Sequence, residues 1–279
     1  MKYYKIVNPR DPFGKKYHEG YNDAPLPFDT SSGCESNGIY FAKEDILVDI
    51  WYGPDLYEVE PIGPVIECKC KYKKYKAHAV NLKYIGKVLD NIEFLVKQGA
   101  DIHVGKDMPL QLAVWLDYFE ILKPLIENGA DVRADNDNPI RIAVGNQNLE
   151  ITKLLIEHGA NIHVNNDEPL RTAAQLGDLK ILKYLIEHGA DVHANNDEAL
   201  KNAVKFYNRD VVKFLIQSGA DIHANNDEAF RMAVQLRFID IAKILIEHGA
   251  NVHANNDEAI KYATYIGYSD MVNLIKQYC

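Results

Sequence analysis

The sequence predicts a mainly α-helical solenoid of stacked helix-turn-helix units, preceded by a small α+β module, and three observations support this fold class. The tripeptide Gly-Ala-Asp or Gly-Ala-Asn begins at glycines spaced 30 residues apart, at positions 99, 129, 159, 189, 219 and 249. Apolar residues between these glycines recur at helical spacing, whereas residues 1–74 contain no 30-residue echo. Because one copy at such a period cannot bury its own apolar faces, we expect neighbouring copies to stack around a continuous core.

The first element of the chain is predicted to be the aromatic-rich α+β module of residues 1–74, which holds seven of the eleven prolines. Short strands are predicted at 3–7, 38–41, 56–59 and 65–69, and a short amphipathic helix at 46–51. A core of this size is marginal by itself, so we expect the module to be stabilised by packing against the first repeat.

The repeating unit is predicted to contain two helices and two turns, as in residues 165–194. Asp167, Glu168 and Pro169 are typical of a helix start, because they supply a capping oxygen, a favourable charge and a residue that needs no amide partner. Gly189 ends the second helix by taking the left-handed conformation. The buried residues are predicted to be Leu170, Ala173, Ala174 and Leu176 in the first helix, and Leu179, Ile181, Leu182, Leu185 and Ile186 in the second.

The segment EPLRTAAQLGDLKILKYLIEHGADVHA resembles the ankyrin repeat pattern, in which a TPLHxA start, a paired-leucine second helix and a closing GAD[VI]N recur. The resemblance covers residues 75–279. It implies a degenerate first unit at 75–104, full units at 105–134, 135–164, 165–194, 195–224 and 225–254, and a truncated unit at 255–279. The style of the units and the aromatic leader also resemble the ankyrin-repeat proteins of giant DNA viruses of the mimivirus type.

The units depart from the ankyrin pattern in three ways. The period is three residues short, which predicts that the projecting fingers of the family are reduced to tight turns. Glu replaces the family's Thr and Arg or Lys replaces its His, so ion pairs within a helix, Glu168 with Arg171 and Asp167 with Arg171, are expected. Pro124 lies inside a predicted second helix and is expected to kink it near Glu120.

Composition narrows the class of partner. A net charge of −9 disfavours binding to nucleic acid or to an anionic membrane. No apolar run approaches the ~20 residues that span a bilayer, and the first residues lack a signal-peptide core, so a cytoplasmic protein, in the host cytoplasm if viral, is expected. The four cysteines, at 34, 68, 70 and 279, are expected to be reduced thiols and not zinc ligands.

Histidines recur both before and after the closing glycines, and two interpretations were weighed. Metal ligands must converge to ~2.0–2.1 Å of one ion, whereas equivalent residues of stacked helix pairs are separated by roughly a helix diameter, ~10 Å. A role at helix C-termini is therefore favoured over metal binding, and neither a metal nor a cofactor is predicted. The histidines are His158, His188 and His248 before the glycine, and His103, His163, His193, His223 and His253 after it.

The predicted partner-binding face follows from the resemblance, which implies that first-helix residues line a concave groove for protein partners. The eighth and eleventh residues of the units vary freely and include aromatic residues of the kind that anchor interfaces, although these could instead cover a repeat boundary or the C-terminal end. The Arg and Lys residues at the family's His place recur along the units and could meet an acidic partner. We favour instead their neutralisation by acidic residues one helical turn earlier in the same helix. The predicted contacts are Trp115, Arg141, Arg171, Lys201, Lys205, Arg231, Met232, Lys261, Tyr262 and Tyr265.

An enzyme in the N-terminal module is the alternative. Residues 38–42, GIYFA, are similar to a strand of ADP-ribosyltransferases, and His18 lies upstream as that family's histidine would. His18 is, however, followed by Glu19-Gly20 where the family has Gly-Ser or Gly-Thr, so a structural strand is favoured. The sequence thus predicts a monomeric, non-enzymatic scaffold or adaptor that binds a host or viral protein.

Overall fold

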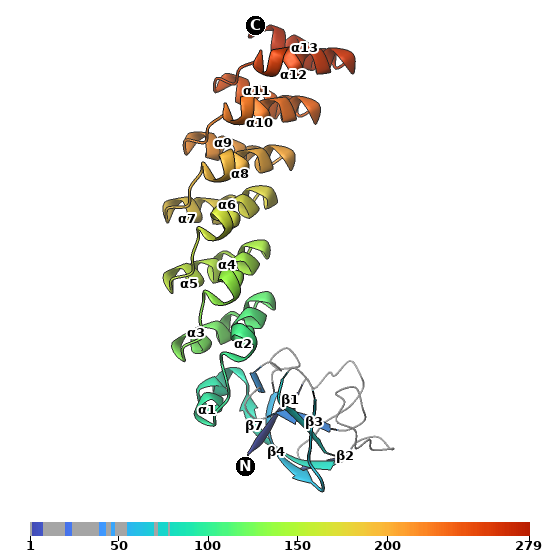
Figure 1. Cartoon of the computed structure of the whole chain (residues 1–279), viewed down its shortest axis with the longest axis vertical. Helices are drawn as coiled ribbons and strands as arrows, with labels where there is room; N and C mark the ends of the chain where they lie inside the picture. Colours follow the sequence, from blue (N-terminus) through green and yellow to red (C-terminus); the bar gives the residue numbers. More distant parts are fainter. Residues whose placement is uncertain are drawn as a thin grey trace. The chain divides into compact units, whose positions relative to one another are not determined.

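The computed structural model describes residues 2–7, 20–23, 39–42, 46–47, 55–69, 72–77 and 79–279. These residues belong to two compact units, residues 1–139 and residues 140–279, and each unit is described by itself. The first contains a β-sheet followed by helices, and the second contains helices alone (Figure 1).

The described strands of the first unit form one seven-stranded antiparallel sheet with the order β2-β7-β4-β1-β3-β6-β5. Strands distant in the chain are paired, as when Tyr3 lies opposite Val59 and Ile39 opposite Ala77. The strands are β1 (Tyr3–Val7), β2 (Gly20–Asp23), β3 (Ile39–Ala42), β4 (Asp55–Ile62), β5 (Ile66–Glu67), β6 (Lys74–Ala77) and β7 (Ala79–Lys87).

One face of this sheet carries an apolar cluster in which aromatic rings meet edge to face. The Tyr3 and Phe41 ring centroids lie 5.0 Å apart, and Tyr75 also contacts Tyr3. Strand side chains alternate between faces, so Tyr4 points to the opposite side, where its ring lies 6.0 Å from that of Phe94. The cluster consists of Phe41, Val59, Ala77, Val80 and Leu82, with Tyr3, Tyr57 and Tyr75 packed against it.

The predicted helix pair at 75–104 is wrong, because β6 and β7 extend the sheet to Lys87. Val80 and Leu82 are buried and alternate with partly exposed Asn81 and exposed Lys83, the period of a half-buried strand and not of a helix. A 3₁₀ turn (Leu89–Asn91) and one helix, α1 (Ile92–Lys97), follow. The strands predicted at 3–7, 38–41 and 56–59 are confirmed within a residue or a few, β5 is shorter than predicted, and of the predicted helix at 46–51 only residues 46–47 are described.

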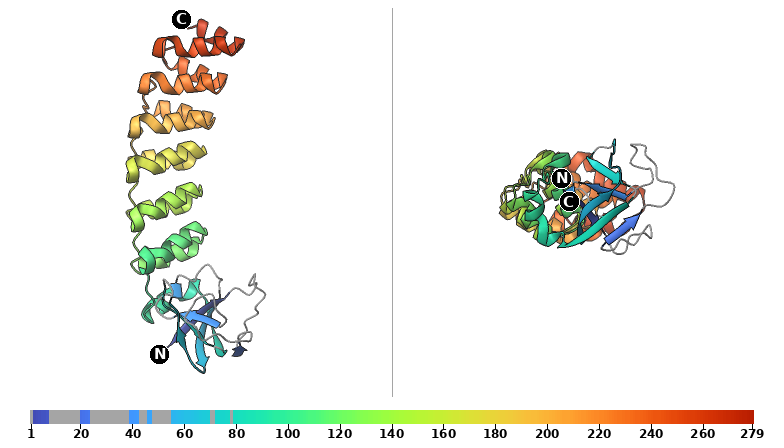
Figure 2. Two further views of the ribbon diagram at one scale, coloured as in Figure 1. Left: turned by 45° about the vertical axis from the view of Figure 1, so that its right-hand side comes forward. Right: turned by 90° about the horizontal axis from the view of Figure 1, so that it is seen from below.

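Twelve further helices follow in pairs, and within residues 140–279 successive pairs stack in chain order (Figures 1 and 2). First helices contact first helices, from α6 to α12, and second helices contact second helices, from α5 to α13. The helices are α2 (Val104–Trp115), α3 (Phe119–Glu127), α4 (Ala134–Gly145), α5 (Leu149–Glu157), α6 (Val164–Leu176), α7 (Leu179–Glu187), α8 (Ala194–Lys205), α9 (Arg209–Gln217), α10 (Ala224–Gln235), α11 (Ile239–Glu247), α12 (Ala254–Tyr265) and α13 (Ser269–Lys276).

Most of the predicted core positions of the units are buried, but Leu179 and Ile186 are only partly buried and Leu176 is exposed. Leu170, Ala173 and Ala174 of α6 are fully buried, as are Ile181, Leu182 and Leu185 of α7. Leu176, predicted to be buried, is 38% exposed, because it lies at the very end of α6 where the chain turns away from the core. Pro124 lies within α3, which runs over nine residues like α5, so the proline does not end the helix, and the kink expected near Glu120 stays a prediction.

The predicted shortening of the fingers is confirmed. Each first helix in the list above includes, near its start, three consecutive residues in the left-handed conformation, such as Asn195 (φ 57°), Asn196 (φ 56°) and Asp197 (φ 55°). Regular helical geometry therefore begins only after them. Asn and Asp are the non-glycine residues that tolerate this conformation best, which explains the recurring Asn-Asn-Asp.

Candidate partner-binding face

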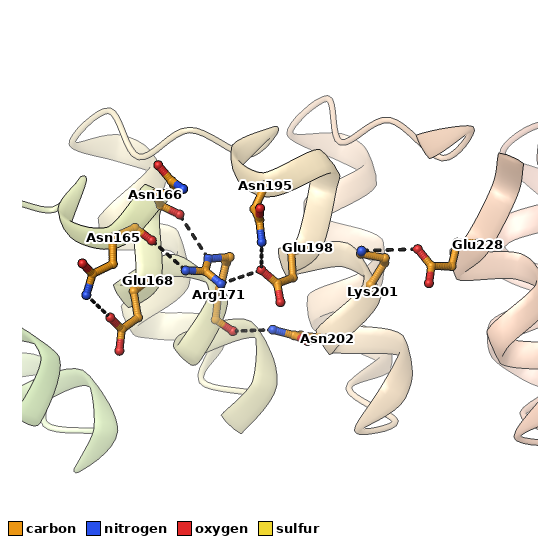
Figure 3. Close-up of polar contacts among 9 residues, drawn as sticks. All are labelled: Asn165, Asn166, Glu168, Arg171, Asn195, Glu198, Lys201, Asn202 and Glu228. Atoms are coloured by element: carbon orange, nitrogen blue, oxygen red, sulfur yellow. Dashed lines mark hydrogen bonds and ion pairs between the residues drawn. The ribbon is translucent and has the colours of Figure 1, made fainter. Parts of the chain in front are cut away.

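A ladder of ion pairs joins each first helix of residues 140–279 to the next one. Each cation contacts the Glu that lies 27 residues later in the chain, in the following unit (Figure 3). The pairs predicted within one helix are therefore not the pairs that form. The N···O distances are 2.9 Å for Arg141–Glu168, 2.5 Å for Arg171–Glu198, 3.3 Å for Lys201–Glu228 and 2.5 Å for Arg231–Glu258.

The arginines of this ladder also hold the left-handed turn of their own unit. Arg171 donates from Nε to the carbonyl of Asn166 (3.1 Å) and from Nη2 to that of Asn165 (2.7 Å), as Figure 3 shows. Lys261, in the last unit, donates to the carbonyl of Asn256 at 2.7 Å. A guanidinium has five donors in a fixed fork, so it serves the turn and the neighbouring carboxylate at once, which an ammonium does less well.

Two of the ladder carboxylates, Glu198 and Glu258, are stabilised in their charged form. The Asn195 side chain donates to Glu198 Oε2, and Arg171 donates to the same oxygen. These hydrogen bonds lower the pKa of Glu198, with the bond from Asn195 the larger cause, and they outweigh the opposing effect of partial burial. Asn255 and then Arg231 lower the pKa of Glu258 in the same way.

A second ladder, of aspartates, links the turns of neighbouring units. Asp197 is only 4% exposed, and its Oδ1 accepts a hydrogen bond from the backbone N–H of Asp221 in the next unit (2.7 Å). The same oxygen accepts from His193 Nδ1 (3.1 Å) in its own unit. The sequence predicted that this Asp caps its own helix; instead its carboxylate serves the turn and the neighbour. The equivalent backbone contacts are Asp131 to Asp107 in the first unit, and Asp191 to Asp167 and Asn251 to Asp227 in the second.

The two histidine series therefore have defined local partners. Those after the glycine donate from Nδ1 to the aspartate four residues later, which is buried in all but the last unit; the distances are 2.7–3.1 Å for His103, His163, His193, His223 and His253. Those before it donate to the carbonyl four residues back at the end of the second helix, as His188 does to Tyr184 (2.8 Å). No cluster of three or more potential metal ligands is found among the described residues.

The predicted contact residues of the second unit lie together on the first helices. A hollow of about 450 Å³ lies between α6 and α8, and its lining joins two predicted cations, Arg171 and Lys205, to the variable positions of both helices. Phe206, which sequence analysis missed, also lines it; the residue following the eleventh position was not considered. The lining residues are Glu168, Arg171, Thr172, Gln175, Glu198, Asn202, Lys205 and Phe206.

The aromatic candidates differ in exposure. Tyr265 is 89% exposed at the end of α12, while Met232 and Tyr262 are partly buried on α10 and α12. Trp115, in the first unit, is 60% exposed at the end of α2. Exposed aromatic rings at positions where the core needs none are available to a partner.

A family model for ankyrin repeats, described as three copies, matches residues 110–196 and 200–278. The chain is an ankyrin-repeat protein. Ankyrin repeats are generally protein–protein interaction modules. The 30-residue units and left-handed turns described above are thus a shortened form of the ankyrin unit.

The similar proteins come from a giant virus and from a bacterium. One ankyrin repeat protein of Acanthamoeba polyphaga mimivirus is 31% identical over 122 residues, which is 40% of this chain and 40% of that protein. An uncharacterized protein of the same virus is 29% identical over 132 residues, 44% of this chain and 96% of that protein. The chain thus matches well under two thirds of the first relative's length, and the predicted resemblance to mimivirus-type ankyrin proteins is confirmed.

Among solved structures, an ankyrin repeat domain from Acinetobacter baumannii superposes with a TM-score of 0.55 at 24% identity. The match covers 61% of this chain and 97% of the bacterial domain, and it supports the fold. In the described part of the chain, no helix is long and apolar enough to cross a membrane.

The residues of the enzyme alternative are only partly described. Residues 39–42 form strand β3, which pairs with β1 and β6, and Phe41 and Ala42 are buried in the sheet. His18 lies outside the described residues.

Proposed function

We propose that the ankyrin repeats bind a protein partner along the face formed by their first helices, and that the chain acts as a scaffold without chemistry of its own. The observation that carries the proposal is the surface position of the eighth and eleventh residues of successive units. They reach the surface side by side along α6, α8, α10 and α12, while the intervening residues are used in the core or in the ion-pair ladder. A continuous surface of variable residues on a rigid helical support suits recognition.

The character of this face changes along the second unit. Around α6 and α8 it offers Thr172, Gln175, Asn202 and Lys205, and around α10 and α12 it offers Met232, Tyr262 and Tyr265. We infer that one part of the partner meets hydrogen-bonding groups and a cation, and another part meets aromatic and thioether surface.

The ladder cations have a smaller role in this proposal than the sequence suggested. Arg141, Arg171, Lys201 and Arg231 are committed to carboxylates of the next unit, so a partner would meet neutralised pairs. Among the predicted contact residues, Lys205 and Lys261 are the cations that form no ion pair within the described part of the chain, so they can meet an acidic group. Trp115 supplies an aromatic contact on the first unit. The mimivirus relatives favour a host or viral partner in the cytoplasm of an infected cell.

The test is affinity purification of the full chain from infected cells, followed by mass spectrometry. A variant with Lys205→Glu, Met232→Asp and Tyr262→Ala is expected to lose at least tenfold of the captured partner while its melting temperature falls by no more than a few degrees. Lys243→Glu, on the outer face of α11, is the matched control and is expected to capture normally. Retained capture by the triple variant would place the binding surface elsewhere.

The absence of chemistry is tested separately. Purified full chain incubated with NAD is expected to release no nicotinamide above a blank. Release that His18→Ala abolishes would replace the scaffold assignment of the N-terminal module by an ADP-ribosyltransferase-like one.

A further inference from the structure

An exposed apolar row follows the turns that join the two helices of each unit. Leu176, Phe206 and Leu236 occupy the same place in three successive units, at or directly after the end of the first helix, and are 38%, 46% and 41% exposed. Ile266 holds this place in the following unit and is partly exposed. One exposed leucine needs no explanation, but a row that recurs with the period of the stack is a continuous apolar strip.

The residue after each member of the row has a left-handed backbone. Gly177 (φ 76°) and Gly267 (φ 69°) occupy this place in the outer two of the four units, but Tyr207 (φ 62°) and Arg237 (φ 63°) occupy it in the two central units. This conformation costs a bulky residue about 1–2 kcal/mol per residue. Strain retained beside an exposed apolar row points to a function for these side chains, since glycine would satisfy the backbone.

The cations beside the row face aromatic rings. The Lys205 ammonium lies 5.5 Å from the centroid of Phe206, and the Arg237 guanidinium lies 6.0 Å from that of Tyr268. Arg141, Arg171, Lys201 and Arg231 pair with carboxylates, whereas neither Lys205 nor Arg237 forms an ion pair within the described part of the chain. A cation over an exposed ring keeps its charge available to an incoming anion.

A hollow of about 390 Å³ adjoins the row between the turns of two units, and Gly177, Tyr207, Asn208, Arg209, Asp210 and Val211 line it. Its shape is held from both sides. Asn208 donates from Nδ2 to the carbonyls of Ala174 (2.8 Å) and Gln175 (2.9 Å), and Tyr207 donates from Oη to Asp240 (2.8 Å). The hollow is thus a fixed recess that has room for a partner's side chain.

We infer that the row Leu176–Phe206–Leu236 docks an amphipathic helix of a partner protein, whose apolar stripe is flanked by acidic residues. Stacked units are separated by roughly a helix diameter, ~10 Å, and seven residues of an α-helix rise ~10.5 Å. An apolar residue in every second turn of the partner helix would therefore meet one row residue per unit. Lys205 and Arg237 select acidic flanks by charge complementarity. This surface shares Lys205 and Phe206 with the proposed groove, while Leu176, Leu236 and Arg237 are not among the residues that line the groove hollow.

The test uses two displayed libraries of helical peptides of about 21 residues, three heptads, with Leu or Phe at every seventh position. One library contains Asp and Glu but no basic residue, and the other contains Lys and Arg but no acidic residue. Selection on the full chain is expected to yield binders from the acidic library. Leu176→Ser with Leu236→Ser should weaken these binders at least tenfold, whereas Met232→Asp with Tyr262→Ala in the groove should leave them within about twofold.

Binders from the basic library alone, binders indifferent to the row variant, or no binders at all would overturn the inference. Self-association of the wild-type chain in sedimentation, lost in the row variant, would assign the row to a second copy of this chain and would equally overturn it. The melting temperatures of both double variants are measured alongside, because the substituted residues of the row are exposed and should leave the fold intact. Failure here leaves the groove proposal standing, since the groove double variant changes Met232 and Tyr262, which are no part of the row.

Discussion

Two edges of the same helix pair behave differently in residues 140–279. At the edge of the left-handed turns, polar groups join one unit to the next: Arg171 reaches Glu198, and Asp197 reaches the backbone of Asp221. At the edge of the interhelical turns, Leu176 and Phe206 are exposed and large residues are kept at positive φ. One edge therefore serves the stability of the stack, and the other is free to be recognised.

Of the two edges, the one at the left-handed turns should show the largest loss of stability, when its buried Asp197 is substituted. Asp197→Ala leaves the Asp221 amide and the His193 ring without their acceptor, so the free energy of unfolding should fall by about 2–4 kcal/mol. Urea denaturation measures it. Asp221→Asn is the control and should change stability by less than about 0.5 kcal/mol, because Asn accepts the same turn bond at positions 161 and 251. An equal loss in both variants would contradict the assigned role of the Asp197 carboxylate.

The arginine ladder should give a smaller effect that depends on the cation. Arg171→Met removes one inter-unit ion pair and two bonds to turn carbonyls, and is expected to cost about 1–2 kcal/mol. Lys201→Met removes a longer contact of 3.3 Å to Glu228 and should cost about 0–1 kcal/mol, as partly exposed pairs do. Thermal unfolding of the two variants compares them. A larger loss for Lys201→Met would refute the view that the guanidinium fork matters.

Acid should reduce the stability that the ion pairs contribute at the edge of the left-handed turns. The folded pKa values of Glu198 and Glu258 are lowered from 4.5, so their contribution to stability is present above that pH and is lost as pH falls through the folded values. Glu198→Gln with Glu258→Gln should flatten the dependence of stability on pH below about 4.5. Denaturation curves between neutral pH and acid record this slope. An unchanged slope would mean that other carboxylates set it.

The smallest effect is expected at the apolar edge. Leu236→Ser removes an exposed side chain, so the free energy of unfolding should change by no more than about 0.5 kcal/mol. Leu245→Ser, fully buried in α11, is the contrasting control and should cost several kcal/mol, roughly 2–5. If Leu236→Ser destabilised the chain as strongly as its control, the row would belong to the core.

The repeats could be predicted from the sequence because the apolar packing between units recurs with the period. Helix pairs, buried positions and shortened fingers followed from one unit. The ion pairs did not, because in a stack with a 30-residue period Arg171 can reach the Glu that lies 27 residues later as well as the Glu three residues earlier. Choosing between them requires side-chain directions that spacing alone does not contain.

The sheet could be predicted only in part. Its strand order brings Tyr3 opposite Val59 and Gly20 opposite Leu82, and no local pattern encodes such distant pairs. β2, β6 and β7 were missed, and the expectation of a repeat unit at 75–104 hid the alternation of Val80 and Leu82. The exposed row was missed for a related reason: Leu176 continues the apolar pattern of α6, and only the structure shows where the chain turns away.

The bond from each buried aspartate ends on a main-chain amide of the neighbour, and every residue except proline carries such an amide. The join between units thus does not depend on which side chain the neighbour presents at that place. A duplicated unit could therefore form the same hydrogen bonds with the units on both of its sides. The number and order of the units can therefore change by duplication and recombination. Their surface residues can diverge while the hydrogen bonds between units are kept.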